Sequence, residues 1–259
     1  MRLKLDATLQ YRMAEPVDVL LAIEAAQRPD QLLVNDLLTV DGVGPMRAIE
    51  GEDGIGRRTW MRASGDFLAH YQAVIDVDRR PTSIDELTIT PRRELPPEVI
   101  PYLWPSRYCE ADRFEAFVER EFPGDNHGAK IMMMARWIQD HLDYCLGSTD
   151  VSTTAVDVFV SRQGVCRDFA HLLTSFARAA GVPARLVSAY ALGLDPPDFH
   201  AVVEVWLAGD WYLVDPTGLA PLDGLVRIAV GRDATDIAFM TVFGTAEMVG
   251  QAVSVSRIG

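Results

Sequence analysis

The sequence predicts an α+β protein, with an antiparallel β-sandwich over residues 1–95 and a domain of helices packed on an antiparallel sheet over residues 96–259. Three observations predict this fold class. The first third of the chain alternates apolar and polar residues between turn signals, a proline-rich stretch follows, and the second half shows helical spacing before it returns to alternation. At about 150 residues per domain, 259 residues suit one or two domains.

The N-terminal third contains short strand candidates. Leu3, Leu5, Ala7 and Leu9 alternate with polar residues until Pro16, and the odd positions of 67–77 are apolar. Short strands between turns are typical of a small sandwich. Residues 17–27 leave two alternatives open, a strand or a strand followed by a helical turn. The further strand candidates are 46–50, 58–62, 66–77 and 85–90.

Five prolines between 91 and 105 rule out a regular element there, because proline lacks the backbone N–H and fixes φ. We therefore place a domain boundary near residue 95. Beyond it, apolar spacing predicts helices over 111–121, 127–142, 154–161 and 166–180. Strands are expected over 184–192, 199–207, 211–215, 225–230 and 251–257, with a hairpin turn at 208–210.

Composition narrows the classes of function. Hydrophobic residues make up 49% and charged residues 24%, as in ordinary globular proteins. The formal net charge of −13 argues against binding nucleic acid or anionic membranes. No apolar run reaches the roughly 18 residues of a membrane span, and the N-terminus lacks an apolar signal region. We therefore expect a cytoplasmic protein.

Three cysteines, Cys109, Cys145 and Cys166, are too few and too irregularly spaced for a disulfide framework or a CxxC zinc site. Cys166 stands where a loop meets a predicted helix, and helix N-termini stabilise thiolates. His200 opens one predicted strand and Asp215 ends the next. Antiparallel pairing of these strands would bring the two residues together, as a Cys/His/Asp triad requires.

Three segments in this order resemble a known family. Residues 164–171 resemble the nucleophile motif of the transglutaminase-like superfamily, 199–205 its histidine motif and 213–217 its aspartate motif. Order and spacing are similar to those of the bacterial cysteine-protease branch, which has an N-terminal β domain. Weaker similarities at 11–17, 181–185 and 231–236 extend the resemblance over nearly the whole chain.

The resemblance implies a papain-like core in which Cys166 is the nucleophile, His200 the general base and acid, and Asp215 the residue that orients the imidazole. Attack on an amide would give a thioester, and the backbone N–H of Cys166 would help to hold the oxyanion. Tyr144, Gln163 and Trp137 are candidates for the second donor. Tyr144 is preferred because its segment resembles one that approaches the cysteine in this family.

The sequence thus predicts a cysteine hydrolase of peptide, isopeptide or γ-glutamyl amide bonds. Acyl transfer to an amine and a non-catalytic module of the same fold are the alternatives. We expect no metal, calcium or other cofactor, and a peptide or protein amide as substrate. The substrate's identity and the oligomeric state stay open.

The remaining polar residues near these motifs have plainer interpretations. Arg167 is either a substrate contact or a solvated charge, and Asp168 stabilises the helix N-terminus. His171 belongs to the core and Glu204 is buried and paired. Cys109 and Cys145 are inert.

Overall fold

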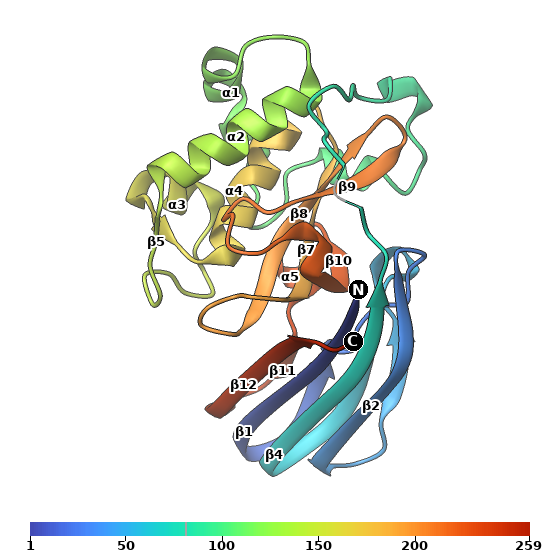
Figure 1. Cartoon of the computed structure of the whole chain (residues 1–259). Coiled ribbons are helices and arrows are strands. Elements are labelled where there is room, and N and C mark those ends of the chain that lie inside the picture. Colours follow the sequence, from blue (N-terminus) through green and yellow to red (C-terminus); the bar gives the residue numbers. More distant parts are fainter. Residues whose placement is uncertain (81) are drawn as a thin grey trace.

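Two antiparallel sheets and a group of helices form the computed structural model, which describes residues 1–80 and 82–259 (Figure 1). The first sheet is dominated by β1 (Arg2–Leu21) and β4 (Arg57–Val77), which pair along almost their whole length. β2 (Gln31–Val43) and β3 (Arg47–Glu50) pair with β4 on its other side. The expected alternation is confirmed, since Leu3, Leu5, Ala7 and Leu9 are all buried.

This sheet corrects the predicted sandwich. In the described residues, six strands form one hydrogen-bonded sheet instead of two facing sheets. β1 continues through Pro16 by a shift of register between Met13 and Val17, so Val17–Leu21 is strand and the helical alternative is wrong. The candidates 58–62 and 66–77 are parts of the single strand β4.

The last two strands of the chain belong to the N-terminal sheet. β11 (Met240–Phe243) pairs with one end of β1, and β12 (Glu247–Arg257) pairs with the other. The backbone N–H of Ile258 also donates to the carbonyl of Arg2, so the two chain ends lie side by side (Figure 1). The expectation that 251–257 joins the second sheet is therefore wrong, because alternation reveals a strand but not its partner.

One predicted strand is absent from the structure, and one strand of the first sheet was not predicted. Residues 85–90 form no strand, although Leu87 and Ile89 pack against the helical core. β2 carries no clean alternation and was not expected; it lies at the edge of the sheet, and Leu32, Val34 and Leu37 are exposed. The proline-rich stretch contains two short 3-10 helices, Arg92–Glu94 and Ile100–Leu103. The domain boundary near residue 95 stays a prediction.

The second sheet is close to the predicted one. β7 (Ala184–Ala191), β8 (Phe199–Leu207), β9 (Asp210–Val214) and β10 (Leu225–Gly231) run in the order β10-β7-β8-β9. The expected hairpin joins β8 and β9, with Ala208 and Gly209 both at positive φ.

Helices cover one face of the second sheet (Figure 1). Their bounds fall close to the predicted ones: α1 (Glu115–Glu121), α2 (His127–His141), α3 (Ala155–Ser161) and α4 (Cys166–Ala179). A further short helix, α5 (Ala234–Ile237), was not expected. Every residue of α4 from Asp168 to Arg178 is buried, which makes α4 the centre of the helical layer.

The other face of the second sheet packs on the first. Tyr190, Phe199, Val226 and Ile228 share one apolar cluster with the buried face of β1 and β4. A buried ionic cluster adds to this contact: Glu204 accepts from Arg185 and Arg227, which also pair with Asp53 and Asp30. The α+β fold class is thus confirmed, and the two sheets share a core. Among the described residues, no helix combines the length and apolar character needed to cross a membrane.

Candidate active site

Cys166 is the first residue of α4, as its position after a loop predicted. Val165 is the N-cap, with extended backbone, and the carboxylate of Asp168 accepts from its N–H at 2.9 Å. The N–H groups of a first helical turn have no partner within the helix, and they favour negative charge nearby. The Cys166 side chain is only partly buried. This is the setting in which a thiolate can form and meet a substrate.

His200 and Asp215 meet as the strand pairing predicted. β8 begins at Phe199 and β9 ends at Val214, and Val203 pairs with Val214 in the antiparallel register. His200 Nε2 lies 3.0 Å from Asp215 Oδ2, and both side chains are buried. The imidazole is therefore held by the carboxylate through one nitrogen.

The other nitrogen of His200, Nδ1, is buried and has no hydrogen bond of normal length to any described residue. Burial by itself lowers the pKa of His200. The hydrogen bond that His200 donates to Asp215 and the interaction with the Cys166 side chain outweigh that effect and raise the pKa to about 9. The imidazolium is therefore favoured at neutral pH, next to Cys166.

Asp215 is itself well supported. Its carboxylate accepts from the N–H of Thr217 at 2.9 Å, from the Thr217 hydroxyl at 2.7 Å and from the N–H of Ala220 at 3.1 Å. Burial raises the pKa of Asp215, but the hydrogen bonds and the charge of His200 bring it below its ordinary value. The carboxylate thus stays ionised and fixed. Sequence reasoning missed Thr217 and Ala220, although their place just after Asp215 is the local signal.

Tyr144 is brought to Cys166 by a two-residue pairing. β5 (Asp143–Tyr144) runs parallel to β6 (Gln163–Gly164), so Tyr144 lies opposite Gly164. Burial raises the pKa of Tyr144, and the charge of Cys166 raises it further, while the backbone N–H of Cys166 acts in the opposite direction. The phenol therefore lies against both the thiol and the N–H of the same residue.

The other two candidates for the second oxyanion donor, Gln163 and Trp137, have different surroundings from Tyr144. Gln163 is exposed, and its side chain makes no hydrogen bond to a described residue. Trp137 stacks between His141 and Phe159, and the Arg162 guanidinium lies 4.8 Å from its ring. Trp137 thus belongs to an aromatic cluster, and its role as a donor stays a prediction. Its regular spacing with other apolar residues of the helix was the signal for a packing role.

The Arg167 side chain is hydrogen-bonded to other groups of the protein. Its guanidinium donates to Asp168 Oδ1 at 2.8 Å, to the Thr149 hydroxyl at 3.1 Å and to the carbonyl of Asp150 at 2.9 Å. Asp168 is wholly buried and does more than face the helix dipole, because it also accepts from Thr149 at 2.6 Å. Sequence reasoning did not single out Thr149, since nothing in the motif points to its loop.

The plainer interpretations are confirmed for the residues the structure tests. His171 is buried, accepts from the N–H of Ala234 at 3.1 Å and stacks on Tyr108. Glu204 is buried between two arginines. Burial raises the pKa of the Cys109 thiol to about 12, which keeps it protonated. Within the described ranges, no group of three or more metal-ligating side chains is found.

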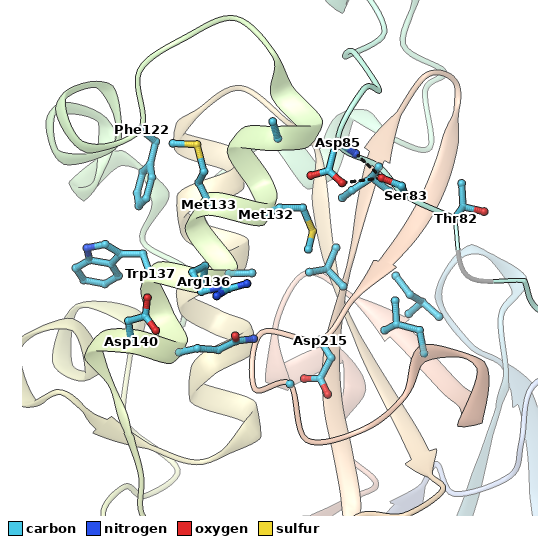
Figure 2. A pocket seen from close by; sticks show the side chains of 18 of the residues that line it. Thr82, Ser83, Asp85, Phe122, Met132, Met133, Arg136, Trp137, Asp140 and Asp215 are labelled. Carbon is cyan, nitrogen blue, oxygen red and sulfur yellow. Dashed lines mark hydrogen bonds between the residues drawn. The ribbon is translucent and has the colours of Figure 1, made fainter.

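A groove of about 1140 Å³ has Asp215 in its wall. It runs between α2, residues 82–85 and the 213–222 segment, and Figure 2 shows Asp215 at one end of it, with Met132, Met133 and Trp137 along the helix side. Cys166 and His200 do not line it. The groove thus reaches Asp215 but neither Cys166 nor His200.

Comparison with known proteins places this geometry in a family. A crystal structure from Cytophaga hutchinsonii, described as a putative cysteine protease, is 33% identical, matches 99% of this chain and 90% of its own, and superposes with a TM-score of 0.93. The sequence profile of the Transglutaminase-like superfamily matches residues 117–216. The chain belongs to the transglutaminase-like superfamily.

Two further relatives match this chain over shorter stretches. An uncharacterized protein of Mycobacterium leprae is 32% identical over 149 residues, which is 52% of either chain. A protein-glutamine gamma-glutamyltransferase of Pseudomonas aeruginosa is 34% identical over 98 residues, 33% of this chain and 15% of its own. The chain thus matches only about half the length of the mycobacterial relative.

Proposed function

We propose that this transglutaminase-like protein is a cysteine-dependent hydrolase of amide bonds in a peptide or protein. One observation carries the proposal: His200 is bound to buried Asp215 through Nε2, and its pKa is raised by Asp215 and by Cys166 together. An imidazole placed between a carboxylate and a thiol is the arrangement that activates a sulfur nucleophile and then returns the proton. The likeness over 99% of this chain to the Cytophaga hutchinsonii structure described as a putative cysteine protease supports it.

The chemistry follows from these positions. The Cys166 thiolate attacks the carbonyl carbon, and the negative charge moves to the carbonyl oxygen. Protonated His200 gives its Nδ1 proton to the leaving amine as the C–N bond breaks, which leaves a thioester on Cys166. Neutral His200 then takes a proton from water as the water attacks the thioester. The acid leaves, and the thiolate and imidazolium are restored.

Oxyanion stabilisation is assigned to the backbone N–H of Cys166 and the hydroxyl of Tyr144. Both donors lie beside the thiol, and a preorganised donor of this kind is worth about 2.7–4 kcal/mol. Gln163 stays a weaker candidate, because its exposed side chain would have to turn toward the thiol. None of these steps calls on a metal or other cofactor. We therefore expect full activity in excess EGTA, and a loss that calcium restores would contradict this.

Acyl transfer to an amine is the second candidate, favoured by the similarity to a protein-glutamine gamma-glutamyltransferase. It shares every step up to the thioester and differs only in the group that attacks next. A third reading, a non-catalytic module, requires that Cys166 does not react. The cytoplasmic location likewise stays a prediction, to be checked by cell fractionation.

One experiment separates these functions. The protein is incubated with p-nitrophenyl acetate, which acylates a thiolate and releases a coloured phenolate, and the modified residue is located by mass spectrometry. We expect acetyl on Cys166 and none in Cys166→Ala. A library of dye-labelled peptide amides, with and without a diamine, then shows whether water or amine takes the acyl group. Acylation that survives Cys166→Ala would overturn the assignment.

A further inference from the structure

The loop over residues 145–150 is tied to the start of α4 by side chains that no catalytic step uses. It follows Tyr144 directly and leads toward α3. Thr149 donates its hydroxyl to Asp168 at 2.6 Å and accepts from Arg167 at 3.1 Å. Arg167 also donates to the carbonyl of Asp150. We refer to Thr149, Arg167 and Asp168 as the loop clamp.

Asp168 joins this clamp to the nucleophile turn. Its carboxylate is wholly buried, and one oxygen accepts from both the Thr149 hydroxyl and the N–H of Val165. The other oxygen accepts from Arg167. A buried carboxylate is costly unless such partners surround it, so the arrangement has little freedom to vary. The loop and the residue before Cys166 thus share one anchor.

The fit around Asp168 is close. A Cβ added at Gly164 would lie 2.8 Å from Asp168 Cβ, nearer than real Cβ contacts come. Gly164 also pairs with Tyr144, and its carbonyl accepts from the N–H of Cys145 at 2.9 Å. The segment that carries Tyr144 is therefore fixed to the nucleophile turn at its start by backbone pairing and at its far end by the clamp.

The same anchor sets the direction of the Cys166 N–H. The carbonyl of Val165 accepts from the N–H groups of Asp168 and Phe169 at 2.9 and 3.1 Å, while the N–H of Val165 is bound by the Asp168 carboxylate. In a trans peptide the N–H points opposite the carbonyl of the same unit. With that carbonyl held toward the helix, the N–H of Cys166 points away from the helix.

We propose that the loop clamp is a positioning device that holds two oxyanion donors, the N–H of Cys166 and the hydroxyl of Tyr144, in register with the thiol. This inference rests on the proposed function, because it assumes acyl chemistry at Cys166. It also assigns Arg167 to the loop and not to substrate. Thr149, Arg167 and Asp168 are positioning residues, since none of them needs to touch the reacting atoms.

The test compares two reactions of Cys166 that differ in their need for an oxyanion site. Acylation by p-nitrophenyl acetate passes through a tetrahedral oxyanion, whereas alkylation by iodoacetamide is a displacement at carbon that forms none. Thr149→Val keeps the shape of the side chain but removes the hydroxyl. We expect acylation to fall about ten-fold or more, as weakening of an oxyanion donor would cause, and alkylation to stay within about two-fold.

Two matched variants complete the test. Thr149→Ser restores the hydroxyl and is expected to restore acylation. Ser152→Ala removes a hydroxyl of the next turn that donates to Asp150, and is expected to leave both rates unchanged. Arg167→Gln serves as a second probe if Thr149→Val does not fold, as judged by circular dichroism, and is expected to lower acylation selectively in the same way.

Each other outcome has a definite meaning. Normal acylation in Thr149→Val would overturn the clamp, as would an equal loss of both reactions, because a general disturbance does not distinguish them. If the wild-type Cys166 alkylates readily but is not acylated, the oxyanion site is absent and the clamp has no such role. If wild-type Cys166 reacts with neither reagent, the proposed function itself fails, and the clamp falls with it.

Discussion

His200 Nε2 lies 3.0 Å from Asp215 Oδ2, which leaves only Nδ1 to serve the thiol of Cys166. The carboxylate thereby selects the useful orientation of the ring and stabilises its charged form. Asp215→Asn should lower the acylation rate of Cys166 about 10²- to 10⁴-fold, because an amide can donate to Nε2 and favour the wrong tautomer. Stopped-flow assays with p-nitrophenyl acetate measure this.

The control for that change is Asp210→Asn, at the exposed start of β9, where the carboxylate accepts from the neighbouring N–H of Trp211. Its rate should equal that of the wild type. An Asp215→Asn protein with an unchanged rate would show that the carboxylate does not orient His200.

Gly164→Ala should damage both stability and reactivity. The added methyl would meet Asp168 Cβ at 2.8 Å, and neither backbone can move freely, since Gly164 is paired with Tyr144 and Asp168 lies in the first turn of α4. We expect a loss of about 1–3 kcal/mol in the free energy of unfolding, as for overpacking elsewhere. Urea denaturation checks it. Gly44→Ala, where the nearest atom is 4.0 Å away, should change little; equal effects at both positions would refute the close fit.

His171 makes the fold sensitive to acid. Burial lowers the pKa of His171 to about 4 in the folded chain, below about 6.5 when unfolded. Between these values the unfolded chain binds more protons, so the stabilising effect is present above pH 6.5 and is lost as the pH falls toward 4. The free energy of unfolding should therefore drop by about 2 kcal/mol from pH 7 to pH 5 on account of this residue.

His171→Gln keeps a hydrogen-bond acceptor for the N–H of Ala234 but cannot titrate. Its free energy of unfolding should depend less on pH over that interval, by the same amount. His141→Gln, on an exposed histidine whose Nδ1 bonds to the Trp137 carbonyl, is the control. Parallel pH curves for wild type and His171→Gln would contradict the prediction.

Glu204 of β8 ties together three strands of the second sheet, because it is buried between Arg185 of β7 and Arg227 of β10. Removing its charge leaves both guanidinium groups short of a partner. Glu204→Gln should lower the free energy of unfolding by about 3–5 kcal/mol, the usual cost of breaking a buried pair from one side. The acylation rate of the remaining folded protein should not change. Asp18→Asn, which breaks the exposed pair with Arg62, should have a far smaller effect; similar losses would contradict the structural role of Glu204.

The sequence predicted the contact between His200 and Asp215 because its geometry is local. A tight turn at Ala208 and Gly209 forces β8 and β9 to pair, and that pairing alone places His200 near Asp215. The helix start at Cys166 likewise depends on its own neighbours. These contacts join residues close in the chain, and for such residues the spacing in the sequence predicts which ones meet.

What could not be predicted depends on distant partners. β12 alternates like any strand, and only the folded chain shows that it pairs with β1. β1 continues past Pro16 because the pairing with β4 shifts its register there. No single residue of the sequence indicates this shift. Thr149 meets Asp168 through a loop of irregular backbone, so its hydroxyl gives no periodic signal. The sequence thus pointed to Cys166, His200 and Asp215, but it gave no sign of Thr149, which supports the loop beside them.

The most direct measurement is competitive alkylation of the three cysteines at pH 6, followed by mass spectrometry, in the wild type and in His200→Ala. A thiolate paired with imidazolium should make Cys166 react at least about ten-fold faster than Cys145, with Cys109 protected by burial. His200→Ala should abolish that advantage. If the three cysteines react alike, or if the advantage of Cys166 survives without His200, the catalytic pair does not exist.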